Sequence, residues 1–544
     1  MFAGGPVKRQ VIRTWSQFWY DYEVPGWLLR RFRLVFFGLF ALDAWLQIEH
    51  ASRYGAGDFN VSHFPWLDGA LPSPSRAGML LVFVLQAYLA LRIALGAANK
   101  WTIGALAALH GYGYFISQLN SYQHHYLLFL MLAICAMVPW HEPDKVVSWA
   151  VRLLLVQISI LYFWAAVAKT GGEWLDGSTL SRQVGPEWGR ALIDRIGGFG
   201  YTAKLIMVGE LFLAVAIQIR LLKPFAFVAG VLLHISIEAF GFQIGMFSWF
   251  MVAVYVIALD RRLPVWAFAA GLVSTAALVQ LKYPAHLFEL GDTVVQLFWF
   301  AVGVHLLVMP ESLAARLRPA TDAIASLWSR LCDRAPTQGA ATWISPAVGA
   351  ALGAGLLLAI PLGGIVVVAI VAAVAGLALA YLATDARQRF TLGIGHVAAC
   401  LIVLLCHQAS DQARRYYEFL GGDERRRQDL PAATAAYEQV REIDPDYAVG
   451  RMRLGDLYRR TNRPEQAVTE YEASVRLEPE DYRAYYGLAL IHDAAKRGPQ
   501  ALAAAQAALP RVGNKLATKL DANTRKAIEN HRSQISRIAA RWRP

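Results

Sequence analysis

The chain has 544 residues, of which 56% are hydrophobic and only 17% are charged, whereas a soluble protein of this length carries about a quarter charged residues. This composition excludes an ordinary soluble fold for most of the chain and predicts a polytopic membrane protein with a more polar C-terminal tail. The net charge of +12 lies largely in short loops between apolar segments, where it sets topology. No nucleic-acid-binding motif accompanies it, so we expect no nucleic-acid partner.

The N-terminal stretch up to Arg31 is basic and rich in tryptophan. It lacks the short apolar core and small-residue cleavage site of a secretory signal. We therefore interpret it as an interfacial helix that leads into the first membrane span. The four cysteines form no Cys-x-x-Cys pair, so neither a disulfide framework nor a zinc site is predicted.

Membrane spans require about 20 predominantly apolar residues. About thirteen such segments follow one another, at 33–49, 77–97, 101–119, 124–140, 146–168, 201–219, 224–240, 244–259, 264–281, 292–309, 343–362, 364–383 and 391–407. Lysines and arginines alternate between the loops as expected for a cytoplasmic N-terminus. The sequence thus predicts an integral protein of a bacterial inner membrane. An odd number of spans places the tail in the periplasm, and one span more or fewer would reverse its side.

The tail repeats with a period of 34 residues. Ala433, Tyr437 and Pro445 recur as Ala467, Tyr471 and Pro479, and the Leu-Gly-x-x-Tyr signature at 454–458 has an echo at 488–489. This pattern resembles the tetratricopeptide repeat, in which small residues let paired helices approach closely. The match covers about 425–509 and implies a concave surface that binds a protein or peptide partner. The alternative is a solvated helical cap without a partner.

Polar residues at the ends of spans form three groups that the predicted topology brings to the outer half of the bilayer. They are Gln123, His124, His125 and Tyr126 at the start of the fourth span, Tyr162, Trp164, Lys169 and Trp174 at and beyond the end of the fifth, and His234 and Glu238 in the seventh. Such residues are costly in a membrane and often functional. Asp43 and Glu49 in the first span and Glu210 in the sixth are also costly, and each is expected to pair with another span or to be structural.

Lys169 is the candidate base. A lysine in an apolar site loses the hydration of its charged form and can then accept a proton near neutral pH. Histidines beside it can orient a hydroxyl or stabilise a developing anion. A pocket of this kind suits a lipid-soluble acid such as a quinol. The alternative for a lysine at a helix end is snorkelling toward the headgroups.

Metal binding is the alternative for the histidines. His124 and His125 are adjacent, so they point to different faces of a helix and make a poor pair of ligands. No Glu-x-x-His pattern completes a di-iron site either. We predict no metal.

Three segments resemble elements of the HTTM domain, the membrane domain shared with vitamin K-dependent gamma-glutamyl carboxylase. They are QHHYLLFLMLAICAMVP from Gln123, LYFWAAVAKTGGEWLDGSTL from Leu161 and LHISIEAFGFQIGMFSWFMVA from Leu233. The resemblance covers about 15–310. It implies that Lys169 is the lysine that deprotonates a vitamin K or menaquinone hydroquinone. His124 and His234 match the family histidines, Gln123 stands where Asn is usual, and Glu238 lies near a frequent Asn.

The resemblance also implies the chemistry. In that family the reduced quinone reacts with O2 to give an epoxide and a strong base, which removes a proton from a glutamate so that CO2 can add. Here Lys169, His124 and His234 would be catalytic. The quinone would be held by Gln123, His125, Tyr126, Tyr162, Trp164, Trp174 and Glu238.

We therefore predict an all-α protein with an HTTM-like domain at 1–310, additional membrane helices at 311–410 and a tetratricopeptide-like domain at 411–544 that recruits a protein partner. The predicted function is that of a carboxylase-like lyase, a quinol-dependent membrane enzyme. The first alternative is a non-catalytic scaffold. The second is a transporter, which the lack of an inverted repeat disfavours.

Overall fold

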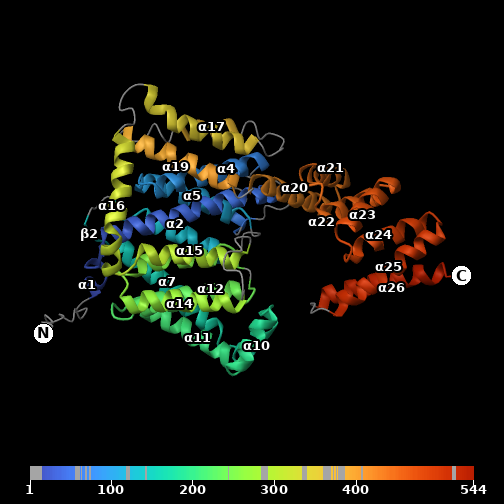
Figure 1. Ribbon diagram of the computed structural model, residues 1–544, viewed down its shortest axis with the longest axis horizontal. Coiled ribbons are helices and arrows are strands. Elements are labelled where there is room, and N and C mark those ends of the chain that lie inside the picture. Colours follow the sequence, from blue (N-terminus) through green and yellow to red (C-terminus); the bar gives the residue numbers. More distant parts are fainter. Residues whose placement is uncertain are drawn as a thin grey trace.

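The computed structural model describes residues 15–54, 62, 64–67, 70–72, 75–117, 123–140, 144–242, 244–282, 292–333, 340–358, 369–371, 373–374, 376–377, 386–405, 408–517 and 522–543. Nearly all elements in these ranges are helical, as the sequence predicts. They form a bundle of apolar helices, from which an array of polar helices extends at one end (Figure 1).

The bundle contains helices whose long axes run side by side (Figure 1). They are α2 (Gly26–Leu46), α4 (Arg76–Ala94), α5 (Lys100–Phe115), α6 (Gln123–Cys135), α7 (Trp149–Ala168), α11 (Gly198–Ala216), α12 (Lys223–Ala239), α13 (Phe247–Ala258), α14 (Val265–Lys282), α15 (Thr293–Leu307), α17 (Ile344–Leu358) and α19 (Ala386–Leu405). Aromatic side chains of α2, fully buried at Phe32, Phe36, Phe37 and Phe40, lie in the core between these helices.

Side-chain caps fix where several of these helices begin. Ser75 accepts a hydrogen bond from the backbone N–H of Gly78 at the start of α4, and Asn99 with Thr102 forms a capping box at α5. Ser148 and Asp292 cap α7 and α15 in the same way. These caps satisfy backbone donors that the first turn of a helix leaves without partners.

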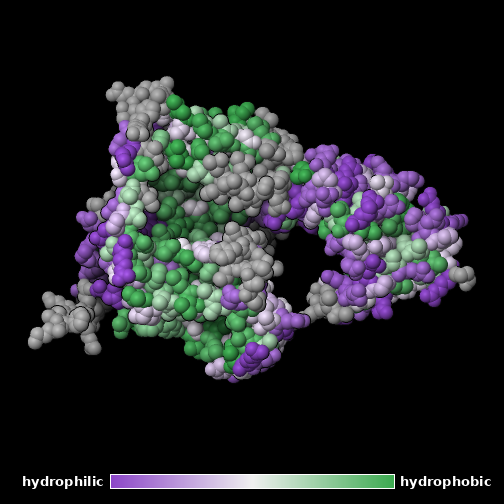
Figure 2. Space-filling model, in the orientation of Figure 1, coloured by the Kyte–Doolittle hydropathy of each residue, from purple (hydrophilic) through white to green (hydrophobic). Residues whose placement is uncertain are grey.

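One end of the bundle carries the N-terminal elements and a crossing helix. The short helix α1 (Trp15–Tyr20) precedes strand β1 (Glu23–Pro25), which pairs antiparallel with β2 (Lys145–Val147), Val24 opposite Val146. Helix α16 (Glu311–Asp333) turns away from α15, with its first part at 93° to that helix, and lies across the helix ends (Figure 1). Figure 2 shows hydrophilic residues along this end and hydrophobic ones over the sides of the bundle.

The count of thirteen spans is corrected by the structure. Among the described residues, five helices are long and apolar enough to cross a membrane, or six if the bent pair formed by α15 and the start of α16 is one span. The apolar stretches at 124–135, 247–258 and 344–358 form shorter helices, below the length of a full span. The sequence count was too high because it took every apolar stretch as a complete crossing. Most of the predicted span at 364–383 lies outside the described residues.

Several short helices lie between the long helices along the chain. The small helices η1 (Gln47–His50), α3 (Ala51–Tyr54) and η3 (Pro65–Leu67) come after α2, and η5 (Ala340–Trp343) precedes α17. Helices α8 (Gly172–Leu175), α9 (Ser178–Gln183) and α10 (Glu187–Arg195) come directly after Lys169. Helix α10 lies at the end of the bundle from which the polar helices extend (Figure 1).

The polar helices form the repeat domain. They are α20 (Gln408–Arg426), α21 (Leu430–Ile443), α22 (Ala448–Arg460), α23 (Pro464–Leu477), α24 (Tyr482–Ala494), α25 (Gly498–Ala517) and α26 (Ala522–Arg541). The side chain of Tyr471 is fully buried and packs against Gly455 and Gly487. A Cβ at Gly455 would lie 2.8 Å from its ring, and a Cβ at Gly487 would lie 2.2 Å from it. Small residues thus allow the close packing of helices that the sequence predicts, and Gly455 belongs to the Leu-Gly-x-x-Tyr signature of the repeat.

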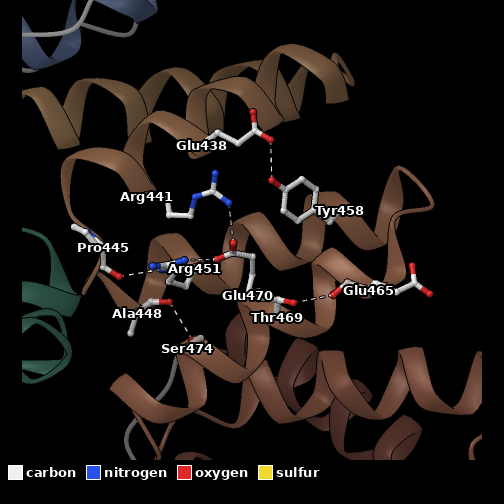
Figure 3. A network of polar contacts seen from close by, with 10 residues as sticks. All are labelled: Glu438, Arg441, Pro445, Ala448, Arg451, Tyr458, Glu465, Thr469, Glu470 and Ser474. Carbon is white, nitrogen blue, oxygen red and sulfur yellow. Dashed lines mark hydrogen bonds and ion pairs between the residues drawn. The ribbon is translucent and has the colours of Figure 1, made fainter.

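A buried ion-pair network joins neighbouring repeats (Figure 3). Glu470, which is 3% exposed, accepts hydrogen bonds from Arg441 and Arg451, each at 2.9 Å. Tyr458 donates to Glu438 at 2.7 Å on the same side. Both carboxylate oxygens of Glu470 therefore have a cationic partner, which is the condition under which a buried charge is tolerated.

The repeat domain docks on the bundle through its first helix. Arg415 of α20 lies 3.6 Å from Glu49 of η1, and Glu424 of α20 forms an ion pair with Arg76 at the start of α4. The ring of Phe419 contacts His50 at a centroid distance of 4.6 Å. Polar and aromatic contacts thus fix α20 against the same bundle end as α10.

Candidate functional site

Lys169 stands at the C-terminal end of α7, which packs along α11. Its Nζ lies 2.8 Å from Oε1 of Glu210 on α11 and also donates to the carbonyl of Ala165 at 3.2 Å. The two charged side chains are only 17% and 10% exposed, and the indole of Trp174 lies 5.3 Å from Nζ. The ammonium group of Lys169 is therefore largely enclosed by protein and paired with a carboxylate.

The ion pair changes the environment that the sequence suggests for Lys169. Its Nζ does not stand alone in an apolar pocket, because a carboxylate oxygen of Glu210 lies 2.8 Å away. The second oxygen of Glu210, Oε2, is buried without a hydrogen-bond partner among the described residues. An orphaned carboxylate oxygen is costly, and it leaves an acceptor for a hydroxyl group.

Tyr162, His234 and Tyr255 form a buried chain of hydrogen bonds one to two turns deeper. Tyr255 Oη donates to Tyr162 Oη at 2.7 Å, and Tyr162 Oη lies 2.8 Å from Nε2 of His234. Because Tyr162 accepts from Tyr255, its own O–H is available to donate to Nε2, which places the proton of a neutral His234 on Nδ1. That Nδ1 is also buried without a partner in the described structure.

Tyr162 lies in α7 and Lys169 follows the helix directly as its C-cap, so the two residues are seven positions apart and lie on the same side of the helix. The site therefore combines an ion pair, a buried acceptor and a buried imidazole N–H in apolar surroundings. Such a set can take a proton from a hydroxyl group and hold the resulting anion.

Two residues of this chain escaped the sequence prediction of the site. Glu210 was recognised only as a costly charge that needs a partner, and Tyr255 was not singled out. A signal for Tyr255 exists in Gly230 of α12, where a Cβ would lie 1.9 Å from the tyrosine ring. The glycine permits the ring to cross α12 and reach Tyr162, but one sequence does not show which side chain fills the space beside a glycine.

The histidines of α6 reach the site through an aromatic ring. His124 and His234 both contact the ring of Phe247, with centroid distances of 5.9 and 5.7 Å. The ring of His125 lies tilted beside that of His124 at a centroid distance of 4.3 Å. The structure thus brings residues of the first and third predicted groups into contact with one phenylalanine.

His125 itself faces another cavity. This cavity is lined by residues of α2, η1, α4, α5 and α6: Asp43, Ala44, Gln47, Phe83, Gln86, His110, Gly113, Tyr114 and His125. His110 lies 3.1 Å from the carbonyl of His125. His125 therefore belongs to a polar cavity beside the site and is separated from Lys169.

The remaining predicted site residues differ in how deeply their side chains are buried in the bundle. Glu238 is buried and accepts from Ser248 at 3.0 Å. Trp164 is 61% exposed and Tyr126 is 43% exposed, so these two side chains point out of the bundle. Residues two positions from a buried helix residue face the opposite side of the helix, and the role of Trp164 and Tyr126 in enclosing a quinone stays a prediction. The side chain of Gln123 lies outside the described residues.

No group of three or more His, Cys, Asp or Glu side chains with metal-binding geometry occurs in the described part of the chain. The polar groups at Lys169 instead consist of one cation, one carboxylate, two phenols and one imidazole, a set typical of proton transfer and hydrogen bonding.

Comparison with known proteins agrees with both resemblances. Residues 25–262 match the model of the HTTM domain, and residues 452–514 match that of a tetratricopeptide repeat. The chain therefore contains an HTTM domain followed by tetratricopeptide repeats. The apolar helices and the HTTM domain are compatible with a membrane protein.

Two solved structures that resemble the chain are those titled "P58(IPK) TPR Domain" and "APC/C hetero-tetramer Cut9-Hcn1". The first is 13% identical and covers 71% of this chain and 98% of its own, and the second is 12% identical and covers 91% and 95%. Both TM-scores are 0.21, which is too low to support an argument from these likenesses. No curated protein matches the chain.

Proposed function

We propose that the chain is a membrane-bound, quinol-dependent enzyme of the vitamin K-dependent carboxylase type. It would couple oxygenation of a reduced quinone to removal of a proton from a protein substrate, with O2 and CO2 as co-substrates. The observation that carries the proposal is the buried Lys169–Glu210 pair at 2.8 Å, which lies inside the matched HTTM domain.

The buried polar atoms fit a hydroquinone. Glu210 Oε2 can accept a hydrogen bond and His234 Nδ1 can donate one, and both lack partners among the described residues. A phenolic hydroxyl needs both kinds of contact. The quinol would supply the reducing electrons for oxygen and the acidic hydroxyl.

Each side chain then has a stated role. Lys169 and Glu210, whose charged groups lie 2.8 Å apart, would act together as the base: the hydroxyl that donates to Glu210 Oε2 would give up its proton to this pair. His234 donates from Nδ1 to the resulting oxyanion, while Tyr162 and Tyr255 fix the imidazole through their hydrogen bonds at 2.8 and 2.7 Å. The apolar ring of Phe247, which contacts both His234 and His124, would help to keep water away from the oxyanion.

The repeat domain would recruit the protein substrate. Tetratricopeptide repeats provide protein-binding surfaces, and α20 docks on η1 and α4 at the bundle end where α10 lies (Figure 1). Because α8 to α10 follow Lys169 directly, a partner held by the repeats would face the Lys169 end of the bundle.

The experiment is an assay of quinone epoxide formation by purified protein supplied with reduced menaquinone or vitamin K and oxygen. Lys169→Ala should lower the rate at least about 100-fold, the usual contribution of a general base. Lys204→Ala, which removes an exposed lysine from neighbouring α11, should leave the rate unchanged. Equal rates in both variants would refute the role of Lys169.

The second candidate function is a non-catalytic scaffold, which the matched repeats favour on their own. A chain that ends after α20, at Arg427, separates the two functions while keeping the docking contacts of Glu424 and Arg415. If the protein is an enzyme, the truncated chain should still oxidise a quinol in the absence of a protein substrate. If it is a scaffold, the truncation removes the protein-binding surface that is its only function.

A further inference from the structure

Two basic side chains are buried at the end of the bundle that carries α1 and β2, away from Lys169. Arg152 lies in the first turn of α7 and Lys223 begins α12, and each is only 3% exposed. Tyr22 connects them, because Lys223 Nζ donates to its Oη at 2.6 Å and the guanidinium of Arg152 lies 5.1 Å from its ring. Two cations are therefore buried side by side.

The carboxylate near this cluster is already engaged by other arginines. Asp260 Oδ2 lies 3.2 Å from Arg220, and Oδ1 lies 3.9 Å from Arg261. Lys223 is within electrostatic reach of Asp260, Arg152, Arg220 and Arg261. In the described part of the chain, the ion pairs of Asp260 are thus with Arg220 and Arg261, and the more deeply buried Arg152 and Lys223 form no ion pair with it.

Arg152 also lacks part of its hydrogen bonding. Its Nε is buried without a hydrogen-bond partner in the described structure, although its guanidinium stacks at 3.7 Å over Phe18 of α1. A buried cation needs a counter-ion and hydrogen-bond acceptors to offset its lost hydration. The N-terminal ends of α7 and α12 add positive potential at the same place.

We propose that Arg152 and Lys223 bind a phosphate-type anion, and that its source is the headgroup of an anionic phospholipid. Guanidinium and ammonium groups between membrane helices recognise lipid phosphates in this way. The cover of the site fits a membrane surface, since α1 exposes Trp15 to 75% and Tyr20 to 62%, and such aromatic residues prefer the headgroup level. Arginines that serve only as topology signals have no need to be buried under a phenylalanine.

The test measures lipid retention by native mass spectrometry of the purified full chain in detergent, with phosphatidylglycerol or phosphatidylcholine added. Wild-type protein should retain phosphatidylglycerol in preference to phosphatidylcholine. Arg152→Gln should weaken retention at least about tenfold, because it removes a charge-assisted contact. Arg316→Gln on exposed α16 is the matched control and should retain the lipid as wild type does.

Folding and the source of the anion are checked separately. Lys223→Gln serves as a second variant if Arg152→Gln does not give a monodisperse protein. Stabilisation by inorganic phosphate to the same degree as by phosphatidylglycerol, lost in Arg152→Gln, would support the anion site and reassign it to a soluble ligand. Equal retention of both lipids, or equal retention by Arg152→Gln and Arg316→Gln, would overturn the proposal.

Discussion

The ion pair between Lys169 and Glu210 makes a quantitative prediction about stability. Both side chains are largely buried, at 17% and 10% exposure, and Glu210 Oε2 already has no hydrogen-bond partner among the described residues. Lys169→Met would leave an uncompensated buried carboxylate, which costs about 3–5 kcal/mol when one partner of a buried pair is removed. The double variant Lys169→Met with Glu210→Leu removes both charges and keeps the volume.

We expect the double variant to lie within about 1 kcal/mol of wild type, because apolar replacements of a buried pair are often neutral or stabilising. The assay is denaturant-induced unfolding in detergent, followed by tryptophan fluorescence. A coupling energy near zero between the two substitutions would show that the pair is not formed, and the reasoning about the site would fail with it.

Two further predictions concern the repeat domain. Gly487→Ala should destabilise it by about 1–3 kcal/mol, because the added Cβ would lie 2.2 Å from the ring of buried Tyr471. Gly422→Ala is the control, because the nearest atom to its added Cβ would be the flexible end of Arg426 at 3.8 Å, and it should be neutral or slightly stabilising. Thermal unfolding of both variants measures the two effects. Equal effects would contradict the packing. Burial and the hydrogen bond to Glu438 raise the pKa of Tyr458 to about 12. The folded chain then holds this proton more tightly than the unfolded chain, whose tyrosines titrate near 10. Stability should therefore fall as pH rises from about 10 to 12, and Tyr458→Phe should reduce that fall in pH-dependent circular dichroism. An unchanged pH profile would contradict it.

The sequence predicted the repeat domain well because its signals are local. Small residues and tyrosines recur at a fixed period, and Tyr437 lies against Gly421 as Tyr471 lies against Gly455, each pair 34 residues from the other. The HTTM resemblance was likewise confirmed, over 25–262, because its motifs are contiguous in the chain.

The candidate site was predictable only in part. Lys169, Tyr162 and His234 are recognisable because charged and polar residues are rare in apolar helices. Their partners depend on how helices rotate against each other, so Glu210 and Tyr255 could not be assigned before the contacts at 2.8 and 2.7 Å were seen. Trp164 shows the same limit, since aromatic residues occur both in pockets and on lipid-facing surfaces.

The number of spans was the weakest prediction. Apolarity alone does not separate a helix that crosses a bilayer from a shorter one packed inside the bundle. Helix α13 illustrates this, because Ser248 and every residue from Phe250 to Ala258 is buried within a helix that is only 12 residues long.

The most direct test of the account is epoxide formation by the double variant Lys169→Met with Glu210→Leu, measured beside wild type with reduced menaquinone or vitamin K and oxygen. The account predicts a folded, stable protein that forms no epoxide, together with robust formation by wild type. Epoxide formation by the stable double variant at the wild-type rate would contradict the proposed role of the pair, and absence of epoxide from folded wild-type protein with both quinols would favour the scaffold.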